Sequence, residues 1–200
     1  MAGKKLRELP YYERPDLTPY LIHLTKRQAK GDKALDSLVS IIQDGVINGT
    51  DSYVKHADSE TRVACFMDVP FAALKYVCAA KNAGRYEPYG VVVPKKSVYK
   101  QKGRPVLYLS NDECDELSIP KVERWRVVAF EHDSENDTWI DWQHEREWRC
   151  PKHFDLRKTP FIALVKTVDE VKELQKRIGT SKCVPLSIIP LAVICQGIDS

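Results

Sequence analysis

Residues 144–149 read His-Glu-Arg-Glu-Trp-Arg and place two carboxylates one residue apart in a run typical of a β-strand. Side chains two positions apart in a strand share a face, so Glu145, Glu147 and Arg149 are predicted to project together. Carboxylates beside a cleft can stabilise a cationic transition state and orient an acceptor, as they do in enzymes that break glycosidic bonds. The alternative is an exposed strand whose glutamates pair with Arg146 or Arg149, which adds little stability.

The first half of the chain supplies four elements that alternate in type. A short strand at residues 20–25 carries His23, and a helix follows at residues 33–43, where aliphatic residues recur at helical spacing. A second strand is predicted at residues 62–67. A second helix, which begins with Pro70, is predicted at residues 70–80.

The second half is richer in strands, because β-branched and aromatic residues dominate its apolar runs. A helix is expected at residues 168–178, and the acidic piece at residues 131–141 is expected to be turn-like. The strands are predicted at residues 90–93, 106–109, 125–130, 144–150, 161–166 and 188–195. This order indicates an α+β fold with two packed sheets, in place of a doubly wound parallel sheet.

Composition bounds the class of protein. The 200 residues, 43% of them hydrophobic, suit a single domain, with residues 1–19 as an N-terminal extension of a core at residues 20–196. A net charge of +3 demands no nucleic-acid partner, although the basic cluster at residues 95–104 leaves phosphate contacts open. The six cysteines lack C-x-x-C spacing, so no zinc site is predicted. Without a signal peptide or a membrane-spanning run, a cytoplasmic protein is expected.

Four motifs follow one another along the chain. They are Leu-Ile-His-Leu-Thr at residues 21–25, Cys-Phe-Met-Asp-Val-Pro at residues 65–70, Tyr76, and Glu-Arg-Glu-Trp-Arg at residues 145–149. With these motifs the chain resembles the AbiGi and DUF2971-like bacterial proteins associated with phage abortive infection, and more distantly the ADP-ribosyltransferases of the histidine–tyrosine–glutamate type. The resemblance implies an ADP-ribosyltransferase-like split pair of packed β-sheets with flanking helices, NAD as substrate, and a role in phage defence.

The same resemblance implies four cofactor-binding residues. His23 would fix the adenosine ribose of NAD through its ring nitrogens, with Thr25 on the same strand face. Tyr76, which follows Phe66 at the family's spacing, would stack on the nicotinamide ring, a contact worth ~1–2 kcal/mol when desolvated. At Cys65 the chain departs from relatives that carry a first stacking tyrosine. Without the resemblance, His23 and Tyr76 are better explained as core residues.

Two catalytic residues are implied as well. Glu147 matches the family's catalytic glutamate, whose carboxylate stabilises the oxocarbenium-like ribose that forms when the bond to nicotinamide breaks. Glu145 would orient or deprotonate the incoming nucleophile, as the first acidic residue does in Glu-x-Glu transferases.

Two other functions remain open from the sequence. One is a non-catalytic nucleotide-sensing or antitoxin-like module on the same fold, because a fold and a motif do not guarantee activity. The other is a divalent-metal nuclease, since carboxylates suit magnesium. Its ligands would come from Glu131, His132, Asp133, Asp137, Asp141, His144 and Glu145. The acceptor is left open between a protein, a nucleic acid, a small molecule and water, as is a toxin, antitoxin or phage protein as partner.

Overall fold

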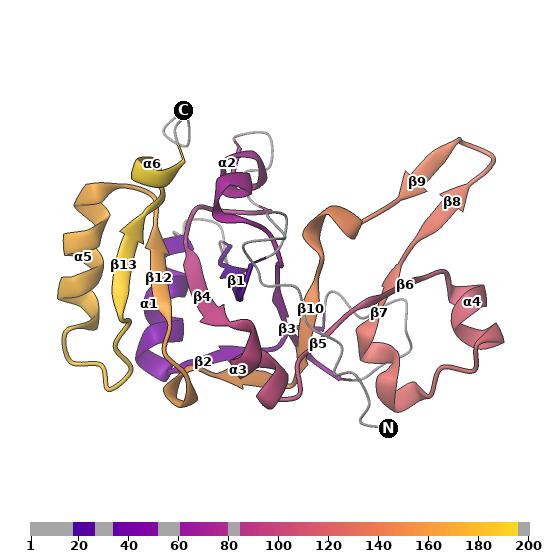
Figure 1. Cartoon of the computed structure of the whole chain (residues 1–200), viewed down its shortest axis with the longest axis horizontal. Coiled ribbons are helices and arrows are strands. Elements are labelled where there is room, and N and C mark those ends of the chain that lie inside the picture. The colour runs from indigo at the N-terminus through magenta and orange to yellow at the C-terminus, as the bar shows by residue number, and fades with distance from the viewer. Residues whose placement is uncertain (1–17, 27–33, 52–60, 80–84, 196–200) are drawn as a thin grey trace, which may run out of the picture.

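The computed structural model describes residues 18–26, 34–51, 61–79 and 85–195 (Figure 1). Its largest sheet has four strands, of which the first three are antiparallel neighbours and the last pair is parallel. In spatial order these strands are β1 (Tyr20–Leu24), β4 (Gly90–Pro94), β12 (Ile162–Val165) and β13 (Ser187–Pro190). The consecutive valines of β4 are all buried, as expected for an inner strand covered on both faces.

A second, antiparallel sheet lies beside β1. Its strands, in spatial order, are β3 (Val63–Phe66), β10 (Trp148–Pro151) and β5 (Arg104–Pro105). The two sheets meet where Ile22 and Met67 exchange backbone hydrogen bonds of 3.0 and 2.7 Å. This bridge brings β1 and β3 side by side and so sets residues near position 23 against residues near position 65.

Two long helices cover the four-stranded sheet at one end of the molecule (Figure 1). Helix α1 (Ala34–Asp44) buries Leu35, Leu38 and Ile42, which lie on one face at helical spacing. Helix α5 (Val168–Ile178) begins with a capping box, in which Thr167 accepts from the Glu170 N–H and Glu170 accepts from the Thr167 N–H. An ion pair of 2.7 Å between Arg177 and Asp36 joins the two helices.

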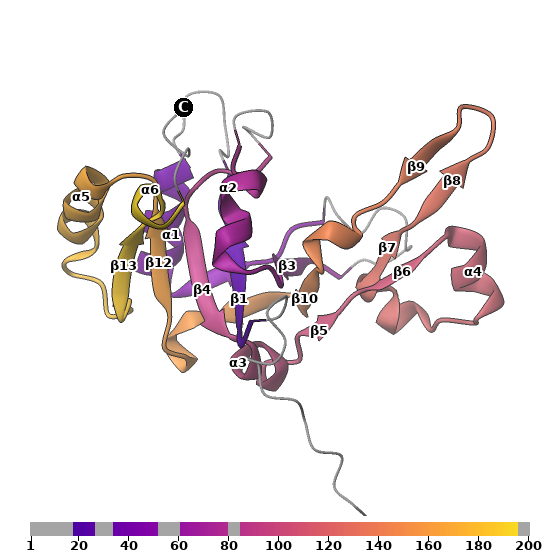
Figure 2. The same ribbon diagram turned by 45° about the horizontal axis from the view of Figure 1, so that its top comes forward.

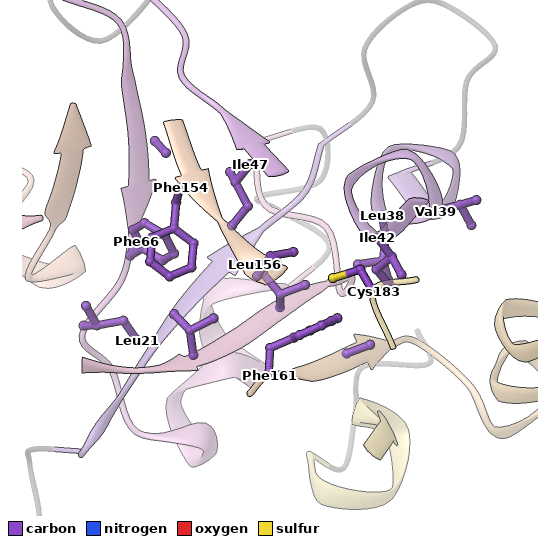
Figure 3. Packing of buried hydrophobic residues seen from close by; sticks show 14 of the residues in the cluster. Leu21, Leu38, Val39, Ile42, Ile47, Phe66, Phe154, Leu156, Phe161 and Cys183 are labelled. Carbon is purple, nitrogen blue, oxygen red and sulfur yellow. The ribbon is translucent and has the colours of Figure 1, made fainter. Parts of the chain in front are cut away.

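The largest hydrophobic core lies between α1, the four-stranded sheet and a small two-stranded sheet (Figure 3). That small sheet pairs β2 (Val46–Asn48) with β11 (His153–Asp155). The rings of Phe66 and Phe154 meet edge to face at 5.2 Å, and both are fully buried. A buried aromatic side chain of this size stabilises the fold by roughly 1.5–3 kcal/mol.

Between β5 and β10 the chain forms an inserted lobe, defined here as residues 107–142. It contains a parallel strand pair, a short helix and an antiparallel hairpin. These elements are β6 (Leu107–Leu109), α4 (Asn111–Glu116), β7 (Val127–Ala129), β8 (Glu131–Asp133) and β9 (Thr138–Ile140). Both views show the hairpin extending away from the sheets (Figure 2).

The α+β class predicted from the sequence is confirmed, and most predicted elements occur within a few residues of their expected bounds. Several segments differ. The expected second helix is a 3₁₀ turn followed by α2 (Leu74–Val77), and β7 is preceded by a 3₁₀ helix (Lys121–Arg126). The acidic piece forms the β8–β9 hairpin. The last expected strand ends at Pro190, where α6 (Leu191–Ile194) begins, since proline cannot continue a hydrogen-bonded ladder.

One correction bears directly on the candidate site. Residues 144–150 are not a single strand: a 3₁₀ turn (Gln143–Glu145) is followed by Arg146 at φ 45° and ψ 51°, and β10 starts only at Trp148. A left-handed residue breaks the two-residue alternation of a strand. Glu145 therefore does not share a strand face with Glu147 and Arg149, whose side chains still project together and pair with each other.

Two further helices were not expected from the sequence, α3 (Lys95–Lys100) in the basic cluster and α4 in the inserted lobe. The predicted N-terminal extension at residues 1–19 lies almost wholly outside the described residues. Within the described ranges, no helix is both long and apolar enough to cross a membrane.

Candidate functional site

A cavity of about 520 Å³ opens where the two sheets meet, a volume within the range of small-molecule sites. Its walls come from β1, α1, β2 and β3, closed on one side by Arg85 and Tyr86 and by the turn that carries the two glutamates. Five of the six predicted site residues line it, namely His23, Thr25, Phe66, Glu145 and Glu147. The structure thus gathers into one cavity residues that are more than 120 positions apart in the chain.

His23 faces the cavity from β1 with one ring nitrogen already engaged. Its Nδ1 lies 2.8 Å from the backbone carbonyl oxygen of Cys65, and burial is the main reason that the pKa of His23 falls below its ordinary value. A neutral ring that donates from Nδ1 to a carbonyl keeps a lone pair on Nε2. His23 can therefore accept a hydrogen bond from a ligand hydroxyl through Nε2.

Thr25 and Phe66 line the cavity but serve mainly the fold. The Thr25 hydroxyl lies 2.9 Å from the carbonyl oxygen of Ala34 and 3.2 Å from that of Tyr89, so its proton is committed to the backbone. Phe66 belongs to the large core through its contact with Phe154. Both residues shape the wall, and neither presents a free donor to a ligand.

Tyr76 does not line the cavity. It lies on α2 with 67% of its surface exposed, and the Lys75 ammonium sits 4.8 Å from its ring centre. The aromatic residue that does line the cavity is Tyr86. No periodicity or motif singles out Tyr86 in the sequence, because it follows a polar stretch without a predicted element.

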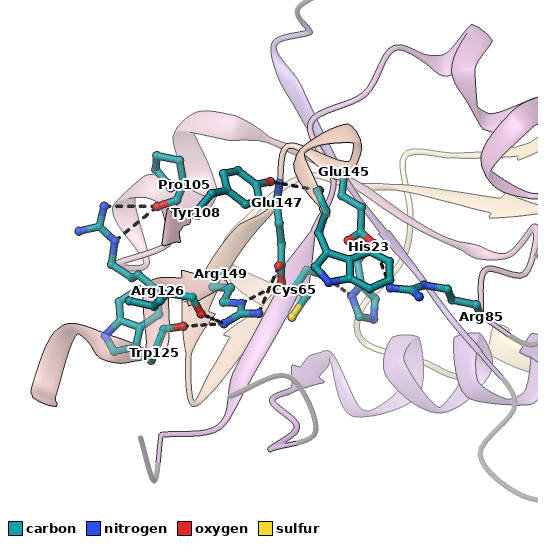
Figure 4. A network of polar contacts seen from close by, with 12 residues as sticks. His23, Cys65, Arg85, Pro105, Tyr108, Trp125, Arg126, Glu145, Glu147 and Arg149 are labelled. Atoms are coloured by element: carbon teal, nitrogen blue, oxygen red, sulfur yellow. Dashed lines mark hydrogen bonds and ion pairs between the residues drawn. The ribbon is translucent and has the colours of Figure 1, made fainter. Parts of the chain in front are cut away.

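Glu147 is buried and held by Arg149 in a two-point ion pair (Figure 4). Arg149 Nε donates to Oε1 at 2.9 Å, and Nη2 donates to Oε2 at 3.2 Å. Arg149 is itself only 2% exposed, and its Nη1 donates to the carbonyl oxygens of Trp125 and Val127 at 3.1 and 2.9 Å. The pairing anticipated as an alternative therefore exists, but it is buried against the inserted lobe.

The backbone on either side of Glu147 is fixed as well. Its N–H donates to the Tyr108 hydroxyl oxygen at 3.1 Å, and its carbonyl oxygen accepts from the Val106 N–H at 3.0 Å. Both partners lie at the base of the inserted lobe. A carboxylate anchored at its backbone and at both oxygens has the preorganisation that electrostatic stabilisation of a transition state requires.

Glu145 reaches the same cavity from the 3₁₀ turn. The Tyr86 hydroxyl donates to its Oε1, and Arg85 Nη2 lies 3.5 Å from the same oxygen. Burial is the main cause, and the neighbouring Glu147 carboxylate the second, of a Glu145 pKa raised to about 7, although Arg85 acts in the opposite direction. A carboxyl that titrates near neutral pH is suited to exchange protons with a substrate.

This raised pKa predicts how stability depends on pH. Glu145 holds its proton more tightly in the folded chain, at about 7, than at the ordinary value of 4.5, so its contribution is complete below pH 4.5 and is lost as the pH rises to 7. Over that window the free energy of unfolding of the unsubstituted protein should fall by up to about 3 kcal/mol because of Glu145. In Glu145→Gln this part of the pH dependence should be absent. Urea unfolding at pH 4.5, 6 and 7.5 measures this, and equal pH profiles for both proteins would contradict it.

Cys65 also lines the cavity, between His23 and Glu147 (Figure 4). Burial, followed by the Glu147 carboxylate, raises the pKa of its thiol well above the ordinary value. The thiol is therefore protonated near neutral pH, and the nucleophilic thiolate form is suppressed.

The acidic residues considered for a nuclease are not gathered into one cluster. His132 and Asp137 pair at 3.1 Å on the exposed hairpin, whereas Glu145 lies in the cavity. Among the described residues, no three His, Cys, Asp or Glu side chains are arranged to hold a metal ion.

No protein-family model matches the chain, and the searches of curated proteins and of solved structures return no match.

Proposed function

We propose that this protein is an NAD-dependent ADP-ribosyltransferase or NAD-cleaving enzyme. The observation that carries the proposal is that His23 and the two glutamates of the Glu-x-Glu sequence line one cavity. The two sheets that meet at β1 and β3 support the finer assignment of an ADP-ribosyltransferase-like split pair of sheets. The resemblance to abortive-infection proteins makes phage defence the proposed setting.

In the proposed binding mode His23 contacts a ribose hydroxyl through Nε2. The nicotinamide ribose then lies toward Glu147, and the cavity wall formed by Phe66 and Tyr86 offers apolar surface to the rings. Among the described residues, the cations that line the cavity are Arg85 and Lys26, and they can face the phosphates. This mode uses Tyr86 where the sequence suggested Tyr76.

The proposed reaction breaks the bond between the nicotinamide nitrogen and the ribose C1′. Nicotinamide leaves with the electron pair, and positive charge develops on the ribose. Each oxygen of Glu147 accepts one hydrogen bond from Arg149, and the Cys65 thiol also hydrogen-bonds the carboxylate. A remaining lone-pair direction can accept from the 2′-hydroxyl. The acceptor's oxygen or nitrogen then bonds to C1′ while Glu145 takes its proton. A pair of carboxylates with separate environments suits these separate roles.

One observation favours the second candidate, a nucleotide-sensing module without turnover. Both oxygens of Glu147 are engaged by a buried arginine, which is also what a purely structural ion pair looks like. In that case the cavity binds NAD or ADP-ribose and reports occupancy to a partner, with no bond broken.

Purified protein should distinguish the two candidates when it is mixed with NAD. An enzyme releases nicotinamide, slowly with water and faster with an acceptor, and chromatography of the reaction mixture measures the release. A sensor raises the midpoint of thermal unfolding with NAD or ADP-ribose and releases no nicotinamide. Absence of both a thermal shift and a product with nicotinamide and adenine nucleotides would reject both candidates. For the variants of Glu145 and Glu147 the matched control is Glu173→Gln, because Glu173 also pairs with an arginine but does not line the cavity.

A further inference from the structure

Two consecutive residues converge on one oxygen of Glu145. The Tyr86 hydroxyl donates to Oε1. The Arg85 guanidinium pairs with the same atom at 3.5 Å (Figure 4). No described residue donates a hydrogen bond to the other oxygen, Oε2. The carboxyl group is therefore held at one end and leaves the other end for a ligand.

Each of the two residues is itself held in place. The Tyr86 ring packs against the second hydrophobic cluster, which contains Ile22, Met67 and Leu74. The Arg85 guanidinium lies 3.8 Å from the ring centre of Trp142, the residue immediately before the 3₁₀ turn of Glu145. Arg85 thus contacts the start of the turn as well as the carboxylate that the turn presents, and both contacts fix the side chain of Glu145.

We propose that Tyr86 and Arg85 are positioning residues, which hold Oε1 of Glu145 so that Oε2 is the atom that takes the acceptor's proton. This role rests on the proposed function, because the proton belongs to the acceptor of ADP-ribose. In the step itself the acceptor's O–H or N–H bond breaks, its electron pair bonds to C1′, and the proton ends on Oε2.

The charged and titratable groups around Glu145 make this role measurable. Burial, followed by the Glu147 carboxylate, favours the protonated form of Glu145, whereas Arg85 and Arg149 favour the ionised form. The neutral His23 ring and the protonated Cys65 thiol line the same cavity. A hydroxyl that donates to a carboxylate stabilises its ionised form, so removing the Tyr86 hydroxyl should raise the pKa of Glu145 further above 7.

The test follows the Glu145 carboxyl carbon by NMR in protein labelled with ¹³C-glutamate, with the signal assigned from its loss in Glu145→Gln. Tyr86→Phe keeps the ring in the apolar cluster and should shift the titration midpoint upward by at least half a pH unit. Arg85→Gln, at a partly exposed position, should shift it in the same direction. The matched control is Tyr89→Phe, because Tyr89 donates to Glu170 at 2.8 Å and does not line the cavity.

The titration and the reaction can fail separately. Unchanged midpoints in both Tyr86→Phe and Arg85→Gln would overturn the positioning role, whatever the protein does with NAD. If the midpoints move, the pH profile of ADP-ribose transfer should move with them, with kcat lower by about tenfold per pH unit below the midpoint. The KM for NAD should stay unchanged in Tyr86→Phe, whereas Arg85→Gln should also raise it, because Arg85 faces the phosphates in the proposed binding mode. A shifted titration in a protein that neither binds nor cleaves NAD would support the contacts and reject the proposed function.

Discussion

Glu147→Gln is expected to lower both ADP-ribose transfer and NAD hydrolysis by about 10²–10³-fold, the loss typical of removing one preorganised electrostatic group. Glutamine keeps the size of the side chain but loses the charge that meets the oxocarbenium-like ribose. Both reactions fall because both pass through the same cleavage of the bond to nicotinamide. The two rates are measured on the same protein, as nicotinamide released with and without acceptor.

Glu145→Gln supplies the contrast, since it should reduce transfer to the acceptor more than hydrolysis. Its proposed role concerns the nucleophile, not the leaving group. Circular dichroism at the assay temperature must show that each variant is folded, because Glu147→Gln also removes the partner of Arg149. Equal losses in both reactions for both variants would contradict separate roles. Unaffected NAD chemistry would make the two glutamates structural.

Arg149→Met is expected to reduce the free energy of unfolding by roughly 3–5 kcal/mol, the usual cost of removing one partner from a buried ion pair. Methionine retains the apolar stem but leaves the Glu147 carboxylate buried and uncompensated. It also leaves the carbonyl oxygens of Trp125 and Val127 without their shared donor. Urea unfolding monitored by tryptophan fluorescence measures the loss.

A double-mutant cycle tests whether the pair is the cause. Glu147→Gln combined with Arg149→Met should lose less stability than the two single changes added together, because neither charge is then left alone in the interior. Arg62→Met is the control, since Arg62 and Asp51 form an ion pair 3.5 Å long with both side chains mostly exposed. That change should stay within about 0.5 kcal/mol. Additive losses at Glu147 and Arg149 would contradict the cycle.

The elements that could be predicted are those with a regular apolar period. Helix α5 occurs at its predicted residues because its aliphatic side chains repeat at helical spacing and a capping box marks its start. The long apolar strands β1, β4 and β12 were also expected, close to their observed bounds. The β8–β9 hairpin was missed, since its acidic sequence carries no apolar alternation and its strands are mostly exposed.

The candidate site was predictable only in part. His23 and the two glutamates stand in motifs, and the cavity brings them together. The break between the glutamates depends on the left-handed Arg146, a conformation that an arginine gives no sequence signal for. Tyr86 could not be found either, because its hydroxyl acquires a role only when the 3₁₀ turn brings Glu145 to it.

The inserted lobe leaves and rejoins the second sheet at almost the same point, since the Val106 N–H donates to the Glu147 carbonyl oxygen. For a closed loop of this kind the entropy lost on closing the chain grows only with the logarithm of its length, by about 0.6 kcal/mol per doubling. Shortening or lengthening the hairpin tip is therefore nearly neutral for the sheet. An insertion at the base is different, because one extra residue between Glu147 and β10 would turn every later side chain of that strand to its opposite face.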